Sequence, residues 1–176
     1  MTTTAALVTA VVVLVVILAV GWAVQTANRL DRLNVRVEKA WQSLEAALER
    51  RTVVARTIAA WMIEQGDNPA AARARELVTV ADHADQAPPD RREEAENEVS
   101  AALARIDDPD RPQALVIELA DAETRVMMAR RFYNDAIRDT RSLADRRLVR
   151  WLRLAGTATV PNYFEIVERG TPGTSD

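Results

Sequence analysis

The feature that most constrains this chain is an uncharged apolar stretch near its N-terminus, Ala5 to Val24. At a rise of ~1.5 Å per residue, a helix of this length covers ~30 Å, the thickness of the hydrocarbon core of a bilayer. The alternative, a cleaved signal peptide, needs a basic N-terminal region and a shorter apolar stretch of about 7–15 residues. The residues before Ala5 contain no basic side chain. The pattern therefore favours a transmembrane anchor, which we predict to occupy residues 1–27.

The charges that flank this stretch predict its orientation. Nothing before it is basic, whereas Arg29, Arg32, Arg36 and Lys39 follow it closely. Lysine and arginine near the end of a membrane span tend to stay in the cytoplasm, and aromatic residues such as Trp22 favour the interface. We therefore expect a single-pass protein of the cell membrane, with its N-terminus outside and the rest of the chain in the cytoplasm.

Composition excludes several kinds of site. The 176 residues include no cysteine and one histidine, His83. The chain therefore has no disulfide, thiolate zinc site or cysteine nucleophile, and one histidine cannot supply a histidine-based metal cage. No glycine-rich phosphate loop is present either. We predict no catalytic residues, no metal and no cofactor.

The remainder of the chain has the pattern of an all-α fold. Apolar residues recur at spacings of three and four, as in helices that bury one face, and no strand-like alternation competes. Glycine and proline divide the pattern into two long and two short helices, which short connections make antiparallel. We predict a bundle over residues 28–155 and a tail over residues 156–176, disordered from Arg169. The expected helices are Asn28 to Gln65, Pro69 to Gln86, Asp90 to Ile106 and Gln113 to Ala155.

Four segments resemble the LemA family. Residues 123–139, ETRVMMARRFYNDAIRD, are similar to that family's pattern E-N-R-[IV]-x-x-A-R-x-x-Y-N-[ED]-A-V-R-x-Y-N on its last long helix. The resemblance covers the chain in the right order, anchor included. The other matching segments are Val37 to Trp41 (VEKAW), the pair Arg50-Arg51, and Pro161 to Glu165 (PNYFE).

The chain also departs from the family pattern. Where the family reads Y-D-L-I-P-N-L-V after its basic pair, residues 52–59 read TVVARTIA, and Thr140-Arg141 replaces the second Tyr-Asn of the last helix. The resemblance implies a divergent LemA-like protein, with one membrane span and an antiparallel helical bundle. It narrows the architecture more than the biochemical activity.

Arg51 is the first candidate site residue, because it falls in the apolar stripe of the first long helix. Glu123, Arg130 and Asn134 share one face of the last helix. One hypothesis is a buried polar cluster of these four residues, in which Arg51 needs a carboxylate partner. The alternative is that Arg51 extends its head to solvent and the other three form a solvated face.

Acidic residues gather in the middle of the chain. A carboxylate di-metal site would require Glu-x-x-His motifs, and the residue three before His83 is Val80. The sequence therefore favours a solvated acidic face, with at most loose screening by divalent cations. The acidic residues concerned are Asp82, Asp85, Glu93, Glu94, Glu96 and Glu98.

A basic cluster with a tryptophan follows near the end of the last helix. Such a cluster suits nucleic acid, an anionic membrane surface, or simply a solvated helix end. Because an antiparallel last helix returns towards the anchor, we favour the membrane surface over nucleic acid. The predicted contacts are Arg146, Arg147, Arg150, Trp151 and Arg153.

The net charge of −3 is the sum of oppositely charged segments along the chain. Residues 25–63 carry a net +3 and residues 124–155 a net +6, whereas residues 64–123 carry −10. The two segments expected near the bilayer are thus positive, which suits an anionic cytoplasmic leaflet. We predict a membrane-anchored, non-enzymatic helical scaffold that binds protein partners, a second copy of the chain among them. The alternative is an accessory or regulatory subunit of a membrane-embedded enzyme, such as a protease.

Overall fold

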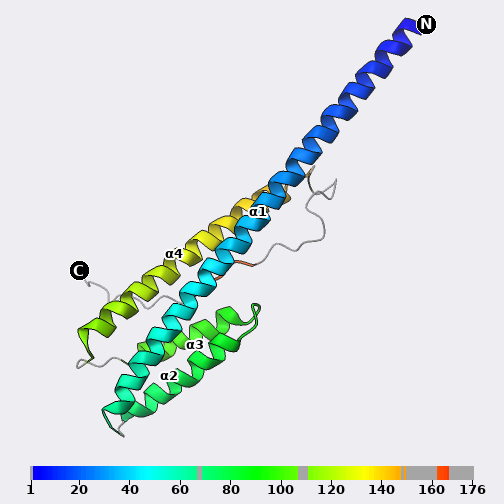
Figure 1. Cartoon of the computed structure of the whole chain (residues 1–176). Coiled ribbons are helices and arrows are strands. Elements are labelled where there is room, and N and C mark those ends of the chain that lie inside the picture. Colours follow the sequence, from blue (N-terminus) through cyan, green and yellow to red (C-terminus); the bar gives the residue numbers. More distant parts are fainter. Residues whose placement is uncertain (1, 67–68, 107–110, 148, 150–161, 167–176) are drawn as a thin grey trace, which may run out of the picture. The chain divides into compact units, whose positions relative to one another are not determined.

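The computed structural model describes residues 2–66, 69–106, 111–147, 149 and 162–166. Within these ranges the chain forms four helices and no strand, so the predicted all-α class is confirmed (Figure 1). The helices are α1 (Thr2–Glu64), α2 (Pro69–Gln86), α3 (Arg92–Ala104) and α4 (Gln113–Ala144).

Helix α1 joins the apolar stretch and the first amphipathic helix without interruption. The large apolar side chains of its first part are exposed, from Leu7 at 66% to Val13 at 52%. Among the described residues, α1 is the one helix that is long and apolar enough to cross a membrane by length and composition. It ends before Gly66, whose φ of +115° is open to glycine and disfavoured for other residues.

The described residues fall in two compact units, each built from parts of α1 and α4. The first unit comprises Met1–Lys39 and Asp135–Asn162, and the second Ala40–Asn134 and Tyr163–Asp176. The predicted boundaries at residues 27 and 155 follow the apolar pattern instead, and they stay a prediction.

The second unit contains the larger hydrophobic core. All four helices contribute to it, and α2 packs along α3 (Figure 1). Many of the buried residues of α2 and α3 are alanines, which allow two helices to approach closely. The larger members of this core are Val54, Ile58, Met62, Leu77, Val99, Leu103, Ile106 and Leu119.

The first unit has a smaller core. This core lies where the predicted last helix is interrupted. Helix α4 ends at Ala144, a turn follows at Asp145, and Arg147 and Val149 are helical again, whereas residues 150–161 lie outside the described part. Leu143 and Val149 are both buried with Leu30 in one cluster. On an uninterrupted helix two residues six apart would point about 120° away from each other. With the helix interrupted at Asp145 and Arg146, both side chains lie in one cluster with Leu30.

Candidate functional site: an arginine–carboxylate network

Arg51 lies at the centre of a buried ionic contact in the second unit. Its side chain is 4% exposed, and its Nη2 atom lies 2.6 Å from Oε2 of Glu96, which is fully buried on α3. The same guanidinium donates to the Glu96 carbonyl at 3.1 Å and to Oγ of Ser100 at 3.0 Å. These bonds are charge-assisted, and they tie α1 to one turn of α3.

Arg92 is the second cation on the Glu96 carboxylate. Its Nε atom donates to Oε1 of Glu96 at 2.9 Å, four residues away on the same helix. Nε of Arg51 and Nη2 of Arg92 are buried and have no hydrogen-bond partner among the residues that the structure describes. Asp85 of α2 approaches Nη2 of Arg92 at 4.0 Å and adds negative charge to the two-arginine, one-glutamate group.

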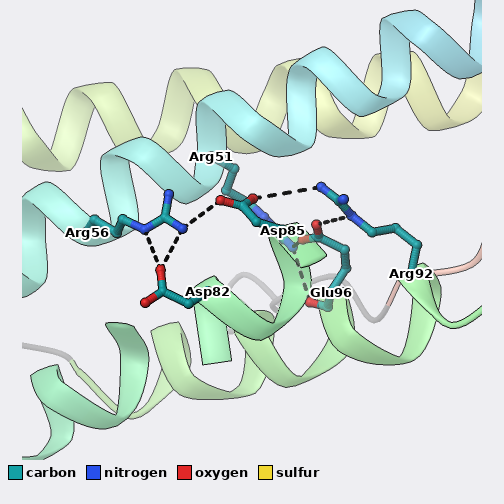
Figure 2. Close-up of polar contacts among 6 residues, drawn as sticks. All are labelled: Arg51, Arg56, Asp82, Asp85, Arg92 and Glu96. Carbon is teal, nitrogen blue, oxygen red and sulfur yellow. Dashed lines mark hydrogen bonds and ion pairs between the residues drawn. The ribbon is translucent and has the colours of Figure 1, made fainter. Parts of the chain in front are cut away.

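Asp85 also connects this buried group to a more exposed one (Figure 2). Arg56 of α1 lies 2.6 Å from Oδ2 of Asp85 and 2.7 Å from Oδ1 of Asp82. The hydrogen bond to Asp85 is the main reason why the pKa of Arg56 lies above its ordinary value, and the bond to Asp82 adds to it. We call Arg51, Arg56, Asp82, Asp85, Arg92 and Glu96 the arginine–carboxylate network.

Arg51 has a different carboxylate partner from the one predicted. Arg51 is buried, so the alternative of a solvent-reaching head does not hold, but its carboxylate is Glu96 of α3. Asn134 binds the backbone of Phe164 instead, and Glu123 and Arg130 are partly exposed on α4. The helical period predicts which side of α1 Arg51 occupies, and it does not predict which neighbouring helix covers that side.

The prediction of a solvated acidic face is wrong for Glu96, whereas Glu94 and Glu98 of the predicted set are exposed. The Glu96 side chain is 0% exposed, and Asp82 and Asp85 are engaged by Arg56. The buried stripe of α3 runs through Arg92, Glu96 and Ser100 at spacings of four, so the helical period indicates this face of α3 but not its partner on α1. Within the described ranges, no group of three or more acidic or histidine side chains is arranged to hold a metal ion.

Asn134 fastens the described C-terminal segment, Asn162 to Ile166, to α4. Its Nδ2 atom donates to the Phe164 carbonyl at 3.0 Å, and its Oδ1 atom accepts from the Phe164 N–H at 2.9 Å. Phe164 is 3% exposed and packs edge-on against Trp41, with ring centroids 5.8 Å apart. Tyr133 lies on the same Trp41 ring at 5.3 Å.

We expect Asn134→Ala to lower the free energy of unfolding by about 1–3 kcal/mol, because the N–H and the carbonyl of Phe164 both lose their partner in a partly buried place. Denaturant titration of the full chain in a neutral detergent, followed by circular dichroism, measures this loss. Asn134→Asp is the matched comparison, since it keeps the acceptor and loses the donor. Equal stability of Asn134→Ala and the wild type would contradict the assignment.

The predicted membrane-surface residues are only partly described. Arg146 and Arg147 are exposed directly after α4, whereas Arg150, Trp151 and Arg153 lie outside the described residues. The predicted disordered tail from Arg169 also lies outside them.

Comparison of the chain with protein-family models, with curated proteins and with solved structures finds no match. The resemblance to the LemA family therefore stays a prediction from the residues that carry it.

Proposed function

We propose that the chain is a single-pass membrane protein whose helices serve as a scaffold for protein partners, without catalytic activity of its own. In this proposal α1 fixes the location through its apolar first part, and the helices that follow occupy the cytoplasm. The basic residues after Val24 support that orientation. The LemA-like segments are consistent with the same architecture.

The observation that carries the scaffold role is the outer face of α4. One face of this helix is buried, through Leu119, Val126 and Tyr133. Large apolar side chains are exposed outside this face, with Val116 and Met127 on its flank and the others on the opposite side, where polar residues would be expected. Methionine and aromatic side chains suit adaptable protein contacts. We call these residues the α4 outer face: Val116 (40%), Ile117 (59%), Met127 (45%), Met128 (54%) and Phe132 (65%).

The test uses the full chain in its membrane, with a photo-crosslinking amino acid in place of Phe132. We expect crosslinks to a discrete partner, because a residue 65% exposed on an apolar face is placed to be covered by it. The matched control carries the crosslinker in place of Glu49, an exposed charged residue of α1 next to exposed Arg50. Crosslinks of equal yield from both positions, or none from Phe132, would contradict the scaffold proposal.

A second variant separates this function from that of an accessory subunit of a membrane-embedded enzyme. Residues 5–24 are replaced with an unrelated apolar helix of the same length, so that anchoring is kept and the sequence is lost. If the helices form the scaffold, we expect this variant to keep the crosslinks from Phe132. Their loss would assign recognition to the anchor and favour the accessory subunit.

A further inference from the structure

A basic pocket lies in the first unit, where the apolar stretch of α1 ends. Its volume is about 360 Å³, and its walls come from α1 and from the chain around the end of α4. The residues that matter for its chemistry are Trp22, Arg29, Arg32, Arg146 and Val149.

Local structure explains why these side chains meet. Trp22, Thr26 and Arg29 follow one another at spacings of four and three, which places them on one face of α1. The hydroxyl of Thr26 donates to the Trp22 carbonyl at 2.8 Å, so its proton is already used. The burial of Leu143 and Val149 against Leu30 holds the turn that contains Arg146 beside this face.

The charges of the pocket are unbalanced. Arg29, Arg32 and Arg146 all line it, and no carboxylate of the described residues does. Within the described part of the chain, none of these three guanidinium groups makes a side-chain hydrogen bond or ion pair. Arg36, one turn further along α1, is by contrast paired with Asp139 at 3.1 Å. Three like charges around one pocket repel each other, so an anion there would relieve the repulsion.

Position selects the kind of anion. Trp22 lies two residues before Val24, the last residue of the uncharged stretch. Aromatic rings at the end of a span lie at the depth of the lipid headgroups. Arginine, with its planar fork of N–H donors, binds phosphate through paired hydrogen bonds. We propose that this pocket binds the headgroup phosphate of an anionic phospholipid, with Arg29, Arg32 and Arg146 as its ligands and Trp22 against the lipid.

This inference rests on the proposed membrane anchoring, and its test keeps the two apart. The full chain is purified in a neutral detergent, and the binding of phosphatidylglycerol and of phosphatidylcholine is measured by native mass spectrometry. We expect a preference for phosphatidylglycerol, because the pocket carries three positive charges and the phosphatidylcholine headgroup has no net charge.

The decisive variant is the triple substitution Arg29→Gln, Arg32→Gln and Arg146→Gln. We expect it to weaken phosphatidylglycerol binding about 100-fold, since each basic residue near the headgroup contributes about fivefold. The matched control removes the same charge outside the pocket, through Arg36→Gln, Lys39→Gln and Arg147→Gln, and we expect it to bind within about threefold of the wild type. A variant with lysine at the three pocket positions keeps the charge, and we expect intermediate binding.

Three results would overturn the proposal. Equal losses in the two glutamine triples would mean that attraction is spread over the whole basic surface. Equal binding of the two lipids by the wild type would mean that the pocket does not select anionic headgroups. Release of phosphatidylglycerol by excess inorganic phosphate would assign the pocket to a soluble anion.

Extraction of membranes with alkaline carbonate tests anchoring separately. We expect the wild type and both glutamine triples to stay in the membrane fraction, because the apolar stretch is unchanged in all of them. Extraction of the wild type would contradict the proposed function, whereas the lipid selectivity measured in detergent tests the pocket itself.

Discussion

Glu96→Ala is expected to lower the free energy of unfolding by about 3–5 kcal/mol, the usual cost of removing one partner from a buried ionic group. The substitution leaves the guanidinium groups of Arg51 and Arg92, 4% and 6% exposed at their side chains, without the carboxylate that both bind. Water cannot replace it, because neither cation reaches the surface. Denaturant titration of the full chain in neutral detergent, with circular dichroism as the signal, measures the loss.

Three further variants separate the loss of a buried charge from the loss of side-chain volume as the cause of this effect. Arg51→Leu should cost less than Glu96→Ala, because Glu96 keeps Arg92 as a partner. Replacing Arg51, Arg92 and Glu96 together with apolar residues of similar size should be neutral or stabilising by up to about 4 kcal/mol. Glu98→Ala is the control on the same helix, since Glu98 is 51% exposed, and we expect a change within about 0.5 kcal/mol. A Glu96→Ala variant as stable as the Glu98→Ala control would refute the buried network.

Phe164→Ala is the second substitution with a large expected effect, a loss of about 3–4 kcal/mol. The ring is 3% exposed and packs against Trp41, so its removal leaves a cavity and ends an aromatic contact. The backbone of residue 164 could still bind Asn134, because alanine keeps the N–H and the carbonyl. The same denaturant titration measures this loss.

Two comparisons test whether the loss in Phe164→Ala comes from the buried ring and its contact with Trp41. Glu165→Ala changes the next side chain, which is exposed, and keeps the N–H that binds Glu93, so we expect a change within about 0.5 kcal/mol. A double-mutant cycle with Trp41→Leu should give a coupling of about 0.5–1.5 kcal/mol for the aromatic pair. Full additivity of the two substitutions would show that the rings do not stabilise each other.

Most helix ends could be predicted from local signals. Helix α2 begins at Pro69 and ends at Gln86, as glycine and proline at its flanks predict. Helix α4 begins at Gln113 as predicted and ends at Ala144, earlier than predicted. Its interruption at Asp145 accompanies the packing of Val149 against Leu30 of α1, a contact distant in sequence that no local pattern contains.

Of the candidate site, the inward position of Arg51 could be predicted from the sequence, whereas its partner could not. The apolar stripe of α1 identified Arg51 as a residue that faces inward, because helical periodicity is a property of one helix. Its partner Glu96 stands among several acidic residues on a short helix, where the surrounding charge suggests a solvated face. Which acidic residue lies opposite Arg51 depends on how α3 packs against α1, and sequence periodicity carries no information on that register.

The contact between Arg36 and Asp139 has a consequence for the order of events during synthesis. The two residues are 103 positions apart, so at the usual rate of translation Asp139 is added about 5–20 s after Arg36. A chain anchored as proposed thus holds its apolar helix in the bilayer while the partner segment is still being made. Arg146 arrives later still and completes the basic pocket. In the proposed arrangement, insertion into the membrane and binding of a lipid headgroup are therefore separated in time, and a ribosome stalled before Arg146 would permit the first without the second.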